Sequence, residues 1–448
     1  MTRWVGPPGR LVVWCAAAGA AASLVVRAPP LLAVALGLLV AAAAVLGGAR
    51  LAALAALALA GGLAVGVLRL EALAADPLGG SIGRRLEATA TVTGDWRGLP
   101  PRWAADARLA DGAPVLLRVA AGRPPPRGSI LAVEGTLRRP DPPKDGYDEA
   151  ALLARRGIRA VLHADAWTRV GSRGGVDGLL DGVRERSLAA YAPAGGDDPG
   201  RLLGALTLGA DETLSIGARR TFRASGLAHL LAVSGSNVAL LVALVLGAAW
   251  VAGAGRALAQ GAAILAIAAY VGVVGASPSV VRAGVAGGLA AAAWLLSRPV
   301  DRWHLFAAGL AALLLHNPYN ALDAGFQLSF AAVAAILLAV PRLTRWFEGT
   351  PIPPLLAVPI AVSGACTLAT APIAWWHFDE LHLVGAVPAN LLAAPAVPAI
   401  LWLGVLAAAL DPVLPVAAAG CAALARYPCL YLYAVAELGA WIDAQVRW

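Results

Sequence analysis

Residues 223–256 read RASGLAHLLAVSGSNVALLVALVLGAAWVAGAGR, with no Asp, Glu, Lys or Arg between the two terminal arginines. About 20 apolar residues suffice for a helix to cross a bilayer, so this stretch is long enough to span a membrane. Its first half nevertheless carries polar side chains and glycines: Ser225, Gly226, His229, Ser234, Gly235, Ser236 and Asn237. Such residues are costly at membrane depth and occur mainly where a helix is broken or faces a protein-lined cavity. The stretch therefore predicts a membrane helix that is broken, or lines a cavity, near its start.

The whole chain has the composition of an integral membrane protein. Its 448 residues are 59% hydrophobic and 14% charged, and the mean hydropathy is +0.72, whereas a soluble protein is about half apolar and a quarter charged. The apolar residues form long uncharged runs rather than the alternation of a membrane β-barrel, so we expect helical spans. Ala and Gly dominate these runs and permit close helix packing, as in the small-xxx-small pair Gly284 and Gly288.

Several kinds of site are excluded by the residue types present. The net charge is +8, and the single lysine, Lys144, is followed by Asp145, so the chain has no nucleotide-binding loop of the G-x-x-x-x-G-K-[ST] type. Transport would then depend on another protein's ATPase, an ion gradient or the membrane potential. The four cysteines lie in apolar runs without a C-x-x-C pair and are interpreted as small buried hydrophobic residues. We expect no cofactor and no metal.

Residues 1–69 are predicted to form the first membrane helices. Apolar runs lie at about 11–26, 31–49 and 51–68, after a short basic start. The first run could be a signal peptide, but the runs that follow it favour a membrane anchor. Three spans with a cytoplasmic N-terminus place residue 70 outside the cell.

Residues 70–170 are predicted to form a small extracellular β-barrel. Between residues 70 and 200 there are 18 Lys and Arg against 17 Asp and Glu, as in a soluble domain. Short runs with period-two patterning, separated by Gly and Pro turns, predict four or five strands. They lie in LEATATVTGDW, WAADARLA, PVLLRVAA and SILAVEGTLRRP. An OB-fold is the natural candidate for such a barrel.

A short helix and a further strand are predicted after these runs, in DEAALLARRGIRAVLHADAW. Arg155, Arg156 and Arg159 gather at the end of the helix. They are either a solvated face or a patch that guides DNA, because guanidinium groups suit phosphates.

Residues 171–200 are predicted to be a Gly- and Asp-rich linker with a polar helix at about 176–191, and residues 201–448 a membrane domain. The start of that domain, 201–224, is amphipathic and basic, which is typical of a helix on the membrane surface. Further uncharged runs follow at about 257–281, 283–297, 303–322, 324–341, 352–378, 381–410 and 412–436. The positive-inside rule places the loops with Arg256, Arg302 and Arg342 in the cytoplasm. The fold class is thus a polytopic α-helical membrane protein of about 10–11 spans, with the run at 381–410 broken by its prolines.

Four segments, in this order, resemble the ComEC family of competence proteins, which are inner-membrane channels for DNA uptake. They are FRASGLAHLLAVSGSNVALL, ASPSVVRAG, LLSRPVDRWHLFAAGLAALLLHNPYNALDAGFQLSF and LATAPIAWWHFDELHLVGAVPANLLAAPAVP. The barrel region, which ends in DEAALLARRGIRAVLHA, is similar to the family's OB-like loop. The resemblance implies a multi-pass cell-membrane channel that imports single-stranded DNA, with a DNA receptor, a cytoplasmic helicase and membrane lipids as partners, in an assembly that could be a homo-oligomer.

The chain departs from the family pattern in two ways. Many members have Leu-His where this chain has Ser236 and Asn237, so no role for that histidine is transferred. Longer members continue into a metallo-β-lactamase-like domain proposed as a nuclease, whereas this sequence has no H-x-H-x-D-H cluster. We therefore expect no enzymatic activity, unless a separate protein supplies the nuclease.

The candidate DNA path consists of Arg282, Ser234, Gly235, Ser236, Asn237, His229 and Gln327. Arg282 is the most suggestive residue, because a charge within a long uncharged stretch favours function. Each candidate has a structural alternative, such as an arginine reaching toward a helix end or a hydrogen bond between helices.

A second hypothesis is a permease or enzyme that acts on envelope lipids or polysaccharides. It requires an acidic or histidine cluster at one membrane face. The sequence offers only the cluster of His377, Asp379, Glu380 and His382. A metal site would also need a ligand from a distant part of the chain, and the sequence indicates none.

Overall fold

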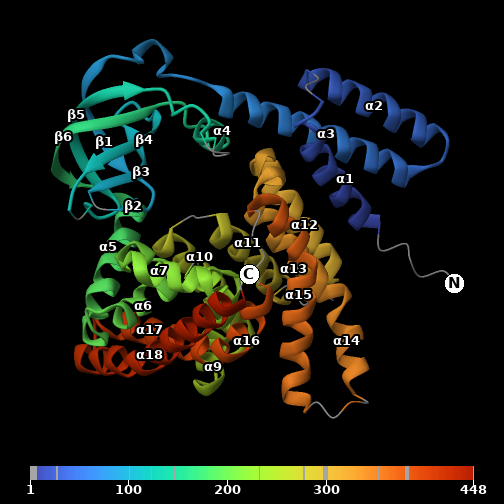
Figure 1. Ribbon diagram of the computed structural model, residues 1–448. Coiled ribbons are helices and arrows are strands. Elements are labelled where there is room, and N and C mark those ends of the chain that lie inside the picture. The colour runs from blue at the N-terminus through green and yellow to red at the C-terminus, as the bar shows by residue number, and fades with distance from the viewer. Residues whose placement is uncertain are drawn as a thin grey trace. The chain divides into compact units, whose positions relative to one another are not determined.

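The computed structural model is largely helical, with one small β-sheet domain (Figure 1). It describes residues 8–26, 29–99, 101–122, 124–144, 148–231, 233–275, 278–295, 301–348, 350, 353–378 and 383–446. The chain forms two compact units. One comprises residues 1–181 and 303–321, and the other comprises residues 182–302 and 322–448. Each unit is described by itself.

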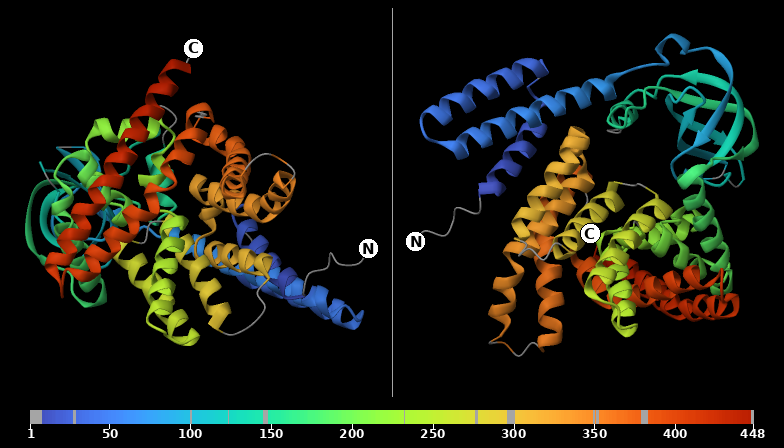
Figure 2. Two further views of the ribbon diagram at one scale, coloured as in Figure 1. Left: turned by 90° about the horizontal axis from the view of Figure 1, so that it is seen from below. Right: turned by 180° about the vertical axis from the view of Figure 1, so that it is seen from behind.

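The first unit begins with the three predicted apolar helices, α1 Pro8–Ala22, α2 Pro30–Leu46 and α3 Arg50–Ala74. Helices α2 and α3 run side by side (Figures 1 and 2). Glycines bring α1 and α3 into backbone contact, because a Cβ atom added to Gly62 would lie 2.2 Å from the carbonyl oxygen of Ala16. Such close approach requires small residues and confirms the predicted mode of helix packing.

The β domain contains all the strands predicted from the sequence and one more. The strands are β1 Arg85–Val92, β2 Arg97–Leu99, β3 Arg102–Leu109, β4 Pro114–Ala120, β5 Ser129–Arg138 and β6 Val161–Ser172. Their order is β1-β5-β6-β4-β3-β2, and an additional β1–β3 pairing closes five of them into a barrel. Only β4 and β6 are parallel. The short strand β2, which the patterning missed, forms a hairpin with β3.

The barrel interior follows from the alternation along each strand. Inward positions of β3 and β5 are buried while the residues between them are partly or fully exposed. The core contains Val92, Ala105, Val115, Leu117, Val119, Leu131, Val133, Leu137 and Leu162. Two tryptophans close it with their indole N–H groups paired: Trp96 donates to the Pro125 carbonyl at 2.6 Å and Trp103 to the Ala121 carbonyl at 3.1 Å. Burial of these rings therefore leaves no indole N–H unsatisfied.

An ion cluster around Asp181 ties the base of the barrel to the helix that follows it. Asp181, on α5 Gly175–Ala190, accepts from Arg127 Nε at 2.8 Å and from Arg173 Nε at 2.5 Å. The side chains of Arg127 and Asp181 are only 5% and 9% exposed. Burial by itself raises the pKa of the Asp181 carboxyl, but the hydrogen bonds from Arg173 and Arg127 outweigh it and hold that pKa below its ordinary value.

Replacing Asp181 by Asn should destabilise the domain by about 3 kcal/mol at neutral pH, because the buried guanidinium of Arg127 and the half-buried one of Arg173 lose the carboxylate that binds both of them. A carboxyl with a depressed folded-state pKa stabilises fully above its unfolded pKa, and that stabilisation is lost as the pH falls below about 4. The melting temperatures of wild type and D181N should therefore converge on acidification in detergent. A gap of constant size down to pH 3 would contradict the role of this carboxylate.

Helix α12 Arg302–His316 and the short turn after it complete the first unit. Trp14 of α1 contacts Phe306 of α12, with ring centroids 5.8 Å apart. Asn317 donates from Nδ2 to the backbone carbonyl of Arg155 at 2.9 Å. The Arg155 region is thus held by a residue distant in sequence.

The second unit is helical. After α5 its helices are α6 Asp198–Leu208, α7 Ile216–Ala224, α8 Ala228–Leu231, α9 Gly235–Val251, α10 Arg256–Val274, α11 Pro278–Leu295, α13 Ala324–Leu338, α14 Val340–Phe347, α15 Pro354–Phe378, α16 Leu383–Ala393, α17 Ala396–Leu410 and α18 Pro415–Val446. The predicted polar helix at 176–191 is α5. The predicted break in 381–410 is the junction between α16 and α17.

Three helices of the described residues are long and apolar enough to cross a membrane: Arg50–Ser81, Arg256–Val274 and Ala357–His377. Helices α13 and α14, bent by 45° at their junction, make a fourth if they are counted as one span. Helices α1, α2, α9 and α17 are apolar but shorter, at 10–17 residues. The apolar runs therefore fold as helices, many of which the breaks shorten below the usual length of a span.

The stretch 201–224, expected to be one amphipathic segment on the membrane surface, divides into two helices, and the first is inside the unit. Residues Leu202–Leu208 of α6 are all buried. The carbonyl groups at the end of α6 accept hydrogen bonds from three other elements. The donors are Asn237 to Leu206 at 2.7 Å, Tyr270 to Thr207 at 2.7 Å and Arg184 to Leu208. Because its otherwise unpaired carbonyls are satisfied, α6 can be buried at low cost.

The start of α6 is held in the same way. Asp197 caps the helix by accepting from the Gly200 N–H, and both of its carboxylate oxygens accept from Arg426 of α18, at 2.7 and 2.8 Å. Arg426 also donates to the Ala194 carbonyl at 2.8 Å. Polar side chains from other elements thus hold both ends of α6. The amphipathic pattern alone did not predict these contacts.

Candidate functional site

The segment 223–256, expected to begin a membrane domain, is broken where its polar residues lie. The short helix α8 ends at Leu231, and α9 begins at Gly235 with Ser234 in an extended N-cap conformation. The hydroxyls of Ser234 and Ser236 lie 2.6 Å apart. The predicted break is therefore present, and two hydroxyl groups occupy the start of α9.

Asn237 has a different position from the two serines. Its side chain is 5% exposed and its Nδ2 donates to the Leu206 carbonyl at the end of α6. The oxygen of the same amide lies 3.5 Å from both serine hydroxyls. Asn237 therefore connects the serine pair to α6, which matches the alternative of a hydrogen bond between helices.

Arg282, on α11, is mostly buried and paired. Its side chain is 11% exposed, and its Nη1 lies 3.6 Å from Oδ1 of Asp323. Asp323 also caps α13, because the same oxygen accepts from the Phe326 N–H at 2.7 Å. Within the described part of the chain, Nε of Arg282 is buried without a hydrogen-bond partner. The guanidinium is thus held against the start of α13 with part of its donor capacity unused.

The start of α9 and the Arg282 turn of α11 are neighbours. A Cβ atom added to Gly235 would lie 3.9 Å from that of Ala283, and one added to Gly325 would lie 3.2 Å from Nη2 of Arg282. The start of α11 therefore packs against the start of α9 through Ala283 and against the start of α13 through Arg282. We call the side chains of Ser234, Ser236, Arg282, Asp323 and Gln327 the polar junction.

Gln327 lies one helical turn after Asp323 and extends the polar junction to α15. Its Oε1 is 3.0 Å from Nε2 of His377. Gln327 therefore lies on the helix that packs against α11, the helix of Arg282, while its side chain contacts His377. His377 belongs to the cluster considered for a metal, whose other members, Asp379, Glu380 and His382, lie outside the described residues.

Among the described residues, the hydrogen-bond contact of His229 is local. It is exposed on α8, and its Nδ1 lies 3.1 Å from the Gly226 carbonyl within the same turn. Of the predicted path residues, Ser234, Gly235 and Ser236 thus lie at the start of α9, while Arg282 and Gln327 lie on the neighbouring helices α11 and α13. Asn237 reaches the group from its buried side.

The arginines of the barrel domain are engaged with acidic residues and backbone. Arg156 makes a two-pronged contact with Asp106 of β3, at 2.7 and 3.0 Å. Arg159 donates to the Leu73 carbonyl at 3.2 Å, while Arg155 is half-buried. Helix α4 Glu149–Ala154 ends just before this group. DNA would therefore compete with an internal carboxylate for Arg156.

A second set of contacts covers the same outer face of the barrel. Arg118 of β4 donates to both oxygens of Glu149, at 2.6 and 2.8 Å, and to Asp141 at 2.9 Å. Leu116 packs beneath them with Leu153, Ile158 and Val161. The segment around α4 thus rests on strand β4. Burial by itself lowers the pKa of Arg118, but the hydrogen bonds to Asp141 and Glu149 outweigh it and leave that pKa raised.

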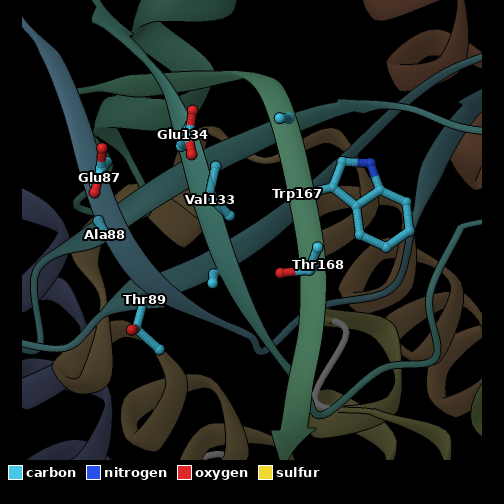
Figure 3. A pocket seen from close by; sticks show the side chains of 9 residues that line it. Glu87, Ala88, Thr89, Val133, Glu134, Trp167 and Thr168 are labelled. Carbon is cyan, nitrogen blue, oxygen red and sulfur yellow. The ribbon is translucent and has the colours of Figure 1, made fainter.

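A shallow cleft of about 330 Å³ lies across β1, β5 and β6. Figure 3 shows Glu87, Thr89, Glu134, Trp167 and Thr168 among its lining residues. Glu87 and Glu134 are direct cross-strand partners. Two facing carboxylates repel a polyanion, so this cleft is unsuited to a DNA strand.

Asp323 is the site residue that the sequence analysis missed. It directly precedes an apolar run, which is the pattern of a helix cap, and this signal was available in LDAGFQ. Its pairing with Arg282 of another helix was not predictable, because it depends on how α11 and α13 pack.

Comparison with known proteins places the polar junction inside a family match. The family described as Competence protein matches residues 206–448. The chain is 32% identical over 170 residues to ComE operon protein 3 of Bacillus subtilis (strain 168), covering 38% of this chain and 21% of that protein. It is 31% identical over 208 residues to Competence protein ComA of Neisseria gonorrhoeae, covering 43% and 28% respectively.

A third relative is the Uncharacterized protein YcaI of Escherichia coli (strain K12), which is 30% identical over 216 residues, or 43% of this chain and 27% of that protein. The matched regions thus span less than a third of each of these relatives. No solved structure matches the chain. The family match extends over more than half of the chain and contains the whole polar junction, which confirms the resemblance found in the sequence: this protein belongs to the Competence protein family.

Proposed function

We propose that this protein is a membrane channel that imports single-stranded DNA into the cytoplasm during natural transformation. The observation that supports it most is the polar junction: a guanidinium and two hydroxyls lie at the starts of three otherwise apolar helices, of which α11 contacts both α9 and α13. The matching family is described as Competence protein, and one of the similar proteins is named Competence protein ComA, which favours the same process. DNA is a polyanion and needs a wet path with some positive potential through the bilayer.

The polar junction is proposed to be the external mouth of this path. Helices α9, α11 and α13 all begin at the junction, and the connections after their opposite ends contain Arg256, Arg302 and Arg342. The positive-inside rule assigns those arginines to the cytoplasm, so the helix starts face outward. A helix start carries a partial positive charge of about half a unit, which attracts phosphate.

Asp323 is proposed to hold Arg282 until a strand arrives. The carboxylate lies 3.6 Å from the guanidinium and is 46% exposed, so solvent and solutes can reach it. An incoming phosphate would replace it as the partner of Arg282, while Asp323 keeps its bond to the Phe326 N–H. Such an exchange lets a strand pass from one partner to the next without a deep energy minimum.

The membrane topology, the domain bounds and the partners are proposed as the sequence predicts them. The chain would be a multi-pass protein of the cytoplasmic membrane with about 10–11 spans, in segments 1–69, 70–170, 171–200 and 201–448. The barrel would lie outside the cell as an OB-like domain, since a closed five-stranded barrel suits that fold, whose members bind oligonucleotides. A DNA receptor and a cytoplasmic helicase would supply capture and energy, and any nuclease would be a separate protein.

Deleting the gene should abolish the uptake of DNA into the cytoplasm while DNA still binds at the cell surface. Labelled DNA that stays with the cells measures surface binding, whereas nuclease-protected labelled DNA and the transformation frequency measure uptake. Complementation with the wild-type gene should restore uptake and transformation. Normal transformation in a clean deletion would rule out the proposed function.

A further inference from the structure

Helix α14 presents two arginines and a tryptophan on its outer side. Arg342, Arg345 and Trp346 are exposed, and the tryptophan side chain is 68% exposed. On the other side Leu343 and Phe347 are half-buried, where α14 packs against α15. Figures 1 and 2 show α14 beside α15. A large exposed aromatic ring on the same side of a helix as two cations is unusual on a surface that faces only water.

The outer side of α14 continues an apolar surface. Val333, Ile336 and Leu338 of α13 are 42%, 38% and 49% exposed. The chain then bends by 45° between α13 and α14, and the exposed residues change from aliphatic to cationic and aromatic. This change, together with the bend, is what a helix undergoes where it leaves hydrocarbon and enters the headgroup layer.

A second aromatic group marks the opposite end of the same helices. Trp375 and Trp376, near the end of α15, are 62% and 85% exposed. The apolar segment Ala357–His377 has 21 residues, which corresponds to about 32 Å of helix. This length is close to the hydrocarbon thickness of a bilayer, about 30 Å. One exposed tryptophan thus precedes this segment of membrane length, on α14, and two others lie at the end of the segment.

The guanidinium groups of α14 retain capacity for a ligand. Arg342 donates through Nη1 to the Leu338 carbonyl, and Arg345 through Nε to the Pro341 carbonyl at 2.9 Å. Within the part of the chain that the structure describes, neither has an ion pair with an acidic side chain. Their remaining N–H groups suit phosphate oxygens.

We propose that α14 lies in the headgroup layer of the cytoplasmic leaflet and binds anionic phospholipid through Arg342, Arg345 and Trp346. The charge is complementary to that leaflet, and the indole matches the position of interfacial aromatic residues. The inference rests on the membrane location proposed above but not on DNA transport. A lipid is favoured over DNA leaving the channel because the surface is continuous with the exposed aliphatic residues of α13.

The depth of Trp346 tests the position of α14. The full chain is reconstituted in nanodiscs of phosphatidylglycerol and phosphatidylcholine whose acyl chains carry bromine near the headgroup or near the bilayer centre. The emission of Trp346 is obtained as the difference between wild type and W346F. Bromine near the headgroup should quench it more strongly than bromine at the centre. Absence of quenching by either lipid would overturn the proposal.

The arginines test the identity of the ligand. In the R342Q/R345Q variant the affinity for phosphatidylglycerol, titrated by native mass spectrometry in detergent, should fall by about 30-fold, or about fivefold for each arginine. The control variant R102Q/R138Q, which changes two exposed barrel arginines, should bind like wild type. Unchanged phosphatidylglycerol affinity in R342Q/R345Q, or loss of oligonucleotide binding instead of lipid binding, would overturn the proposal. A transport defect without a lipid defect would concern the proposed channel and leave this inference intact.

Discussion

Replacing Arg282 by Gln should lower DNA uptake into the cytoplasm by about 100-fold. The guanidinium would donate hydrogen bonds to a phosphate while the strand passes Arg282, and a hydrogen bond to a charged group contributes about 1.5–3 kcal/mol to the stability of that transition state. Surface binding of DNA should be unchanged, since the substitution lies in the membrane domain. Arg282→Lys should give an intermediate value, because lysine keeps the charge but loses the planar fork. Uptake of labelled DNA, normalised to the amount of protein in the membrane, measures the effect.

The exposed Arg220 of α7 provides a matched control, and R220Q should take up DNA like wild type. The ion pair with Asp323 could by itself make Arg282 important for folding. The double variant R282Q/D323N separates the two roles because it removes both charges. If Arg282 only stabilises the fold, the double variant recovers both protein level and uptake. If Arg282 contacts the strand, the double variant recovers the level alone. Wild-type uptake in R282Q would exclude Arg282 from the path.

Replacing Gly404 by Leu should destabilise the second unit by more than any surface substitution. A Cβ atom added to Gly404 of α17 would lie 2.4 Å from Cγ2 of Thr207 and 3.0 Å from Cδ1 of Leu203. Both are buried on α6, so there is no space into which they can move. Overpacking of this kind costs about 1–3 kcal/mol. We expect the melting temperature in detergent to fall by several degrees and the protein level in the membrane to drop.

Gly420 of α18 is the matched control, because a Cβ atom added there meets nothing within 4 Å. G420L should melt like wild type although it makes the same change within a helix. Equal melting temperatures of G404L and G420L would contradict the close packing of α6 against α17. A displaced α6 would also weaken the hydrogen bonds that its carbonyls accept from Asn237 and Tyr270.

The barrel strands were predicted closely because period-two patterning is local. Each expected run corresponds to a strand, and the strands β3 and β5 alternate as the residues do. The roles of the outer arginines were not predictable in the same way. No partner for Arg156 was evident in the sequence, yet in the structure it contacts Asp106 of strand β3. A pattern in neighbouring residues gives the face of a strand but not the partner that the fold brings to it.

The apolar segments likewise were predicted where the signal is local and were misplaced where distant contacts decide. Hydropathy predicted the apolar helices, the break before α9 and the division of 381–410, because bilayer length and the chemistry of Gly, Ser and Pro act locally. It misplaced 201–208, since the carbonyls at the end of α6 are satisfied by Arg184, Asn237 and Tyr270 from three distant elements.

By itself, the sequence determined that this chain is rich in apolar helices, that it contains a small β domain, and that it resembles competence proteins. Composition, periodicity and motif order are sufficient for those statements. Only the tertiary structure decided that Asp323 faces Arg282, that the start of α11 packs against those of α9 and α13, and that α6 is buried. Those features depend on contacts between residues far apart in the chain, and packing selects such contacts without leaving a local pattern. The segment 223–256 illustrates both levels: its polar break is visible in the sequence, whereas the arginine beside that break comes from another helix.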